Sequence, residues 1–178
     1  MAPFSRRTAG LFGLLCAALG LSDHRARAAT FPLLATNAGG TVALGPASTR
    51  IALIPDGGSD VLRQRLAGRG PDLKVQIVLR DLHAAAQPGV VYDVYFGLPP
   101  GPVPACSEAV GVLNFFAVAP PNPGRSVSRV YDVTDRVLAL LSRGLPADRL
   151  AVTIAAGSGQ TPDTAANPTI GTVDLVIE

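Results

Sequence analysis

The sequence predicts a mainly all-β protein: an antiparallel β-sandwich or jelly-roll-like barrel with one or two short helices. Short runs in which apolar and polar side chains alternate recur along the chain, and this period of two is typical of half-buried strands. Turn-forming residues separate them, with 19 Gly and 16 Pro in 178 residues. About seven or eight such runs and little helix favour two packed sheets or a closed sheet.

The first 29 residues are predicted to be an export signal. Arg6 and Arg7 precede an apolar run over 11–21, and small residues follow at Ala28 and Ala29. The run is too short to span a bilayer comfortably, and the arginine pair resembles twin-arginine signals, whose substrates cross the membrane already folded. We therefore expect a periplasmic or extracellular protein of residues 30–178, without a membrane span in the mature form.

A lipoprotein anchor at Cys16 is the alternative, although Leu14 and Leu15 stand where small residues would be expected. Without the signal the chain has 11 Lys and Arg against 12 Asp and Glu, whereas the whole chain has 15 against 13. This balance leaves no basic surface for nucleic acid. About 149 residues fit one domain with its own core.

Extended pieces are expected within 41–54, ended by the turn at 55–58. A short helix follows, capped by Ser59 or Asp60 and stopped at Gly68. The next strand is predicted over 73–82, where apolar and polar residues alternate.

Residues 90–118 hold five of the nine Tyr and Phe residues and two strand signals. In the first strand Asp93 and Gly97 lie on one face, and the other face is apolar: Val90, Tyr92, Val94, Phe96 and Leu98. The second strand, 110–118, is apolar on both faces, so we expect cover on both sides. Prolines in the loop 99–108 between them cannot join a ladder and make it stiff and exposed.

A second Pro-rich loop is predicted over 119–126, followed by a strand over 127–133. Thr134 is expected to cap a helix over 134–143 that closes one end of the sheet. Strands over 150–155 and 172–177 flank a polar loop from 157 to 168.

Catalytic and metal-binding residues are scarce in the mature part. It contains one histidine, His83, and one cysteine, Cys106, whereas a first-row metal site usually takes three or four ligands. No G-x-S-x-G occurs, and the carboxylates of Asp93, Asp132 and Asp174 lie on separate elements. We expect no catalytic residue, metal or cofactor, and rank an enzyme that uses Cys106 or His83 last.

Five segments in order resemble the carboxy-terminal β-domain of tyrosinases and polyphenol oxidases. They are YDVYFGLP, VGVLNFF, SVSRVYDVTDRVLALLSRG, DRLAVTIAAGSG and PTIGTVDLVIE. The family's K-F-D-V-Y-V motif corresponds to the run from Tyr92 to Phe96. The resemblance covers about residues 41–178, but the catalytic domain with its six copper-binding histidines is absent from this chain.

The resemblance implies a lid and not a catalyst, because in that family the β-domain covers the dicopper pocket and inserts a placeholder side chain. We expect a non-catalytic exported domain that docks on a separately encoded tyrosinase-type copper oxidase and shields or assists it. The alternative is a stand-alone exported β-sandwich that binds a glycan or a cell-surface ligand. For a partner-contact patch the candidates are Val103, Cys106, Leu113 and Phe115, without a choice of placeholder.

Overall fold

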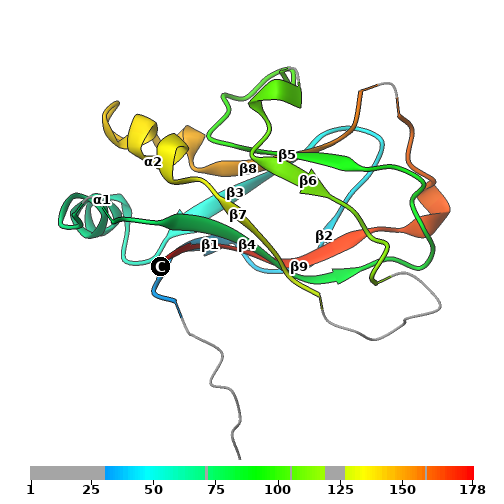
Figure 1. The fold of residues 1–178 in the computed structure, drawn as a ribbon, viewed down its shortest axis with the longest axis horizontal. Coiled ribbons are helices and arrows are strands. Elements are labelled where there is room, and N and C mark those ends of the chain that lie inside the picture. The colour runs from blue at the N-terminus through cyan, green and yellow to red at the C-terminus, as the bar shows by residue number, and fades with distance from the viewer. Residues whose placement is uncertain (1–30, 71, 105, 119–126, 159) are drawn as a thin grey trace, which may run out of the picture. The chain divides into compact units, whose positions relative to one another are not determined.

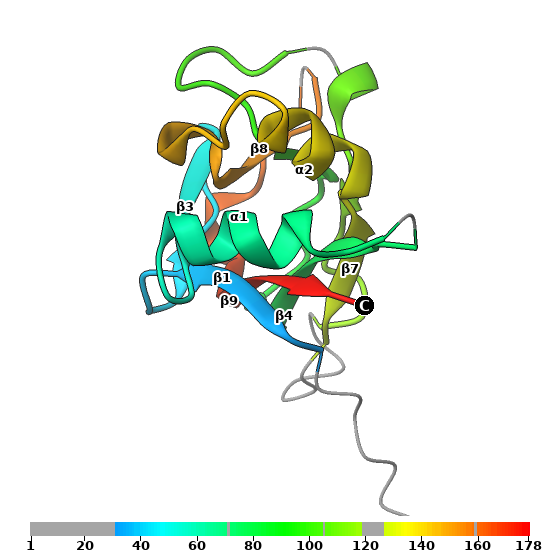
Figure 2. The same ribbon diagram turned by 90° about the vertical axis from the view of Figure 1, so that its left-hand side faces the viewer.

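The computed structural model describes residues 31–70, 72–104, 106–118, 127–158 and 160–178. In this part of the chain nine strands form one antiparallel sheet in the order β6-β5-β8-β3-β1-β9-β4-β7, and β2 pairs with β9. Figures 1 and 2 show this sheet curled into a nearly closed barrel, with both helices at one end. The expected all-β class with two short helices is confirmed. The predicted signal 1–29 and the loop 119–126 lie outside the described residues.

The elements have the following bounds. The strands are β1 Leu33–Asn37, β2 Val42–Ala43, β3 Thr49–Pro55, β4 Val75–His83, β5 Tyr92–Phe96, β6 Gly111–Leu113, β7 Arg129–Asp132, β8 Ala151–Ala156 and β9 Thr169–Ile177. The helices are α1 Ser59–Ala67 and α2 Thr134–Leu141, with 3-10 turns η1 Cys106–Glu108, η2 Ala147–Arg149 and η3 Thr164–Ala166.

Strand β1 was not predicted, although it lies inside the sheet between β3 and β9. Its register with β9 shifts between Leu33 and Ala35, so the strand does not keep a simple alternation, and both Leu34 and Ala35 are buried. A bulge of this kind hides the period of two on which strand prediction depends.

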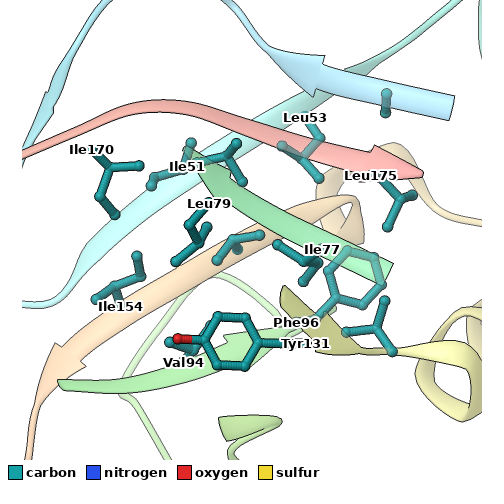
Figure 3. Packing of buried hydrophobic residues seen from close by; sticks show 14 of the residues in the cluster. Ile51, Leu53, Ile77, Leu79, Val94, Phe96, Tyr131, Ile154, Ile170 and Leu175 are labelled. Atoms are coloured by element: carbon teal, nitrogen blue, oxygen red, sulfur yellow. The ribbon is translucent and has the colours of Figure 1, made fainter. Parts of the chain in front are cut away.

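The barrel interior is filled by residues from facing strands, as expected from their alternation (Figure 3). Ile77 and Leu79 of β4 are fully buried, and Tyr92, Val94 and Phe96 of β5 are at most 3% exposed. These side chains belong to one hydrophobic cluster, to which every strand from β3 to β9 contributes. The predicted inward faces of the strands at 73–82 and 90–98 are therefore confirmed.

The prediction of one long strand over 110–118 is wrong. Strand β6 covers only Gly111–Leu113, and a turn follows at 116–118. Leu113 and Phe115 are buried inside the barrel, where Phe115 packs edge-on against Tyr92 with ring centroids 5.9 Å apart. They need no outside cover, because the barrel itself surrounds them. The exposed residues are instead Val112 and Phe116, at 55% and 65%.

Both predicted helices are confirmed, but neither is capped as expected. Helix α1 is preceded by Gly58 at φ 92°, and no side chain caps it. Gly58 rather than Ser59 or Asp60 is the cap because the turn before the helix needs a positive φ that glycine adopts readily. Helix α2 begins at Thr134, whose hydroxyl is occupied by contacts to β4 and Asp132 and not by a cap bond. Among the described residues no helix has the length and apolar character needed to cross a membrane.

Candidate functional site

A pocket of about 350 Å³ lies on the outer face of β5 and β8, beneath part of the Pro-rich loop 99–108. Strand residues alternate between the two faces of a sheet, so Asp93 and Tyr95 point outwards while Tyr92 and Val94 point into the barrel. Asp93 pairs with Ala155 of β8, whose small side chain leaves room above the sheet. The lining residues are Asp93, Tyr95, Val103, Pro104, Cys106, Ala155, Ala156 and Ser158.

Tyr95 connects the sheet to the loop. The residue is 2% exposed although it is on the outer face, and its hydroxyl lies 3.3 Å from the backbone carbonyl of Pro104, to which it donates a hydrogen bond. Burial raises the pKa of this phenol, and the negative charge of Asp93 raises it further. Tyr95 therefore stays a neutral donor at ordinary pH and holds the loop against the strand.

Two of the predicted contact residues lie together in this pocket. Val103 is half-buried in its wall, and Cys106 is exposed and forms no disulfide. The other two, Leu113 and Phe115, are buried in the core and cannot contact a partner without unfolding. For these two residues the expectation of a surface patch is wrong.

The exposed residue that sequence reasoning missed is Val112. It pairs with Asp93 across β5 and β6, so the two side chains share the outer face of the sheet. Alternation places Val112 and Leu113 on opposite faces, and the pairing of Leu113 with Tyr92 in the structure decides that Val112 is the outward one. Phe116, the most exposed of the large hydrophobic residues described, follows three residues after the end of this short strand.

Metal-binding groups are not brought together in the described part of the chain. His83 is exposed at the end of β4, and Cys106 lies in the loop after β5. No cluster of three or more His, Cys, Asp or Glu residues that could hold a metal ion occurs among the described residues. The pocket offers a carboxylate, a buried phenol, a thiol and an apolar rim. These groups suit non-covalent binding through polar and apolar contacts.

No protein-family model and no curated protein matches the chain.

Proposed function

We propose that the protein is a non-catalytic exported β-domain that docks on a separately encoded tyrosinase-type copper oxidase and shields or assists it. One observation carries the docking surface: Val103, Cys106 and the exposed Val112 surround the same outer face of β5, with Asp93 between them. The kind of partner is supported by the resemblance of the chain to the lid domain of tyrosinases.

The loop suits a part that is inserted into another molecule. Prolines restrict the backbone at 99, 100, 102 and 104, and the bond from Tyr95 to Pro104 fixes its position on the sheet. A loop that is already ordered loses little entropy when it binds, so more of the contact energy appears as affinity.

Exposed apolar side chains on β6 and in the turn that follows it add contact area. Val112 and Phe116 are both more than half exposed, and burying such surface contributes about 25 cal/mol per Å². Val112 pairs with Asp93, which lines the pocket, so a partner that covers Val112 would also approach Cys106 and the pocket rim. We infer that this combined surface, defined by Val103, Cys106, Val112 and Phe116, is the docking surface.

The test is to mix the full chain with a tyrosinase-type copper oxidase from the same organism that lacks a β-domain of its own. Phenol oxidation and copper loading should both change several-fold when the chain is in excess. Val112→Lys and Phe116→Ser should abolish the change, because each removes apolar area from the docking surface. In Val112→Lys the new side chain would face Asp93 across the β5–β6 pair, so its positive charge would have an oppositely charged neighbour.

Ile54→Lys is the matched control, since Ile54 is 54% exposed on β3, three strands away from β6 in the sheet. It should behave like the wild type. The lid proposal is wrong if oxidation and copper loading stay the same with wild-type chain in excess, or if Val112→Lys and Phe116→Ser act like the wild type. The generic binding-module alternative then takes its place.

A further inference from the structure

A second pocket, of about 200 Å³, lies where the two ends of the loop 99–108 meet helix α2. Its lining contains three arginines and one carboxylate, so it carries an excess of positive charge. The lining residues are Phe96, Gly97, Leu98, Pro99, Glu108, Arg136, Ala139, Leu140, Arg143 and Arg149. The docking surface proposed above includes none of them.

The three guanidinium groups come from two sides. Arg136 and Arg143 are seven residues apart on and just after α2, so they lie on the same side two turns apart. Ala139 lies between them, and its small side chain leaves space. Arg149 comes from η2 and completes the lining.

Few of the guanidinium donors are used within the described part of the chain. Arg136 donates to the backbone carbonyl of Glu108 at 3.1 Å, and Arg149 donates to that of Gly97 at 3.4 Å. Arg149 also forms a long ion pair with Asp148, at 3.8 Å. The side chain of Arg143 makes no hydrogen bond or ion pair with any described residue. A guanidinium has five N–H donors, so most remain available to a ligand.

The walls of this pocket are held in place by other contacts. Arg50 of β3 donates to the carbonyl of Leu98 at 2.9 Å and to the carbonyl of Asp148, which links the loop to η2. Gly97 has φ 74°, and a Cβ atom there would lie 2.9 Å from Cδ1 of Leu140. Because the loop and helix are fixed before a ligand arrives, binding costs little ordering.

We propose that this arginine pocket binds a small oxyanion, namely the phosphate or carboxylate group of a small solute. The planar fork of arginine forms paired, charge-assisted hydrogen bonds with both kinds of group. An anion between Arg143 and Arg149 would relieve the repulsion of like charges and supply acceptors for their unused donors. The volume suits a single phosphate or a short dicarboxylate and excludes a polymer as the group inside the pocket.

The test measures binding of inorganic phosphate and of succinate to the full chain by calorimetry at constant ionic strength, with chloride as the balancing anion. We expect saturable binding of one anion per chain. Arg143→Gln and Arg149→Gln should each weaken it about tenfold or more, as expected for loss of a charge-assisted contact. Arg143→Gln is the cleaner variant, because the Arg143 side chain has no hydrogen bond or ion pair with a described residue to lose.

Arg69→Gln is the control, since it removes the same charge from an exposed arginine outside the pocket. It should bind like the wild type. Tighter binding of phosphate would identify a phosphorylated solute, and tighter binding of succinate a dicarboxylate. Absence of saturable binding by both anions, or equal weakening in Arg69→Gln and Arg143→Gln, would overturn the proposal.

Discussion

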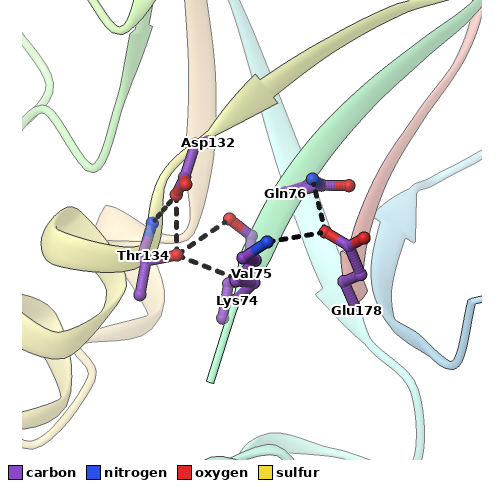
Figure 4. A network of polar contacts seen from close by, with 6 residues as sticks. All are labelled: Lys74, Val75, Gln76, Asp132, Thr134 and Glu178. Carbon is purple, nitrogen blue, oxygen red and sulfur yellow. Dashed lines mark hydrogen bonds and ion pairs between the residues drawn. The ribbon is translucent and has the colours of Figure 1, made fainter. Parts of the chain in front are cut away.

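The hydroxyl of Thr134 joins three parts of the molecule: the end of β7, the start of α2 and the start of β4 (Figure 4). It donates to the Asp132 carboxylate at 2.6 Å and accepts from the backbone N–H of Val75 at 3.0 Å. The Asp132 carboxylate also accepts from the Thr134 N–H at 2.9 Å. The Thr134 hydroxyl therefore satisfies a backbone N–H 59 residues away on β4, and the Asp132 carboxylate satisfies the N–H at the start of α2.

Replacing Thr134 by Val should remove the two hydroxyl bonds, to Asp132 and to the Val75 N–H, with little change in side-chain size. The Val75 N–H would lose its acceptor, and an unsatisfied, partly buried donor costs about 1 to 3 kcal/mol. Urea unfolding should show this loss, whereas Thr134→Ser, which keeps the hydroxyl, should stay within about 0.5 kcal/mol of the wild type. Equal stability of the Val and Ser variants would mean that the hydroxyl contributes nothing.

Asp132 gives the same network a pH dependence. The hydroxyl of Thr134 lowers the pKa of Asp132 below its ordinary 3.8, and the Thr134 N–H and the charge of Lys74 lower it further. A depressed pKa in the folded state stabilises the protein above the unfolded pKa, and the effect is lost as pH falls through the folded pKa. The advantage of wild type over Asp132→Asn in unfolding free energy should therefore shrink between about pH 5 and pH 2.5. A constant difference across this range would contradict the assigned cause.

Strand β5 is the element whose inward face the sequence predicted most fully. Tyr92, Val94 and Phe96 alternate into the barrel, and Phe96 is 3% exposed. Truncating Phe96 to Ala should cost about 3 to 5 kcal/mol in unfolding free energy, measured by urea or heat. Asp93→Asn, on the outer face of the same strand, is the control and should be nearly neutral. A melting temperature for Phe96→Ala within a degree or two of the wild type would contradict this packing.

Alternation predicted the strands wherever an element keeps it over several residues, as β4, β5 and β9 do. It failed at β1, where a bulge interrupts the register, and at 110–118, where only three residues pair. The candidate site was half predicted for the same reason. Val103 and Cys106 lie in a loop that its prolines identify in the sequence. To recognise that Val112 and not Leu113 is the surface residue requires the register of the β5–β6 hairpin, which a long, irregular loop does not specify.

Closure of the barrel depends on the contact between its two edge strands. The Tyr131 hydroxyl of β7 donates to the Val112 carbonyl of β6 at 3.0 Å, where the described residues show no ladder between these strands. The ring lies over Gly111, where a Cβ atom would approach the ring to 2.5 Å. Gly111 is needed here for close approach, because any side chain would displace the ring.

Gly111→Ala should separate the two edge strands. The added methyl group cannot fit beside the Tyr131 ring, and overpacking of this kind costs about 1 to 3 kcal/mol. Gly45→Ala is a matched control, since a Cβ atom there meets nothing within 4 Å and its φ is not positive. Amide hydrogen exchange should show faster exchange in β6 and β7 of Gly111→Ala alone. Unchanged exchange in both strands would mean that the contact does not hold them together.

The same contact predicts how the whole molecule responds to alkali. Burial raises the pKa of Tyr131 to about 12, from an ordinary value of 10.0, despite the opposing charge of Arg129. Between these two pH values the folded state keeps the proton that the unfolded state loses, so stability falls as pH rises, by at most about 1.4 kcal/mol per pH unit for this group.

Tyr131→Phe should be less stable than wild type at pH 7 by about 0.5 to 1.5 kcal/mol, because it lacks the bond to Val112. Its stability should fall less steeply above about pH 10, since it has no phenol to ionise at this position. Urea unfolding of both proteins from pH 7 to pH 11 measures the two slopes. Parallel curves would show that the Tyr131 hydroxyl is not buried at the junction of the edge strands.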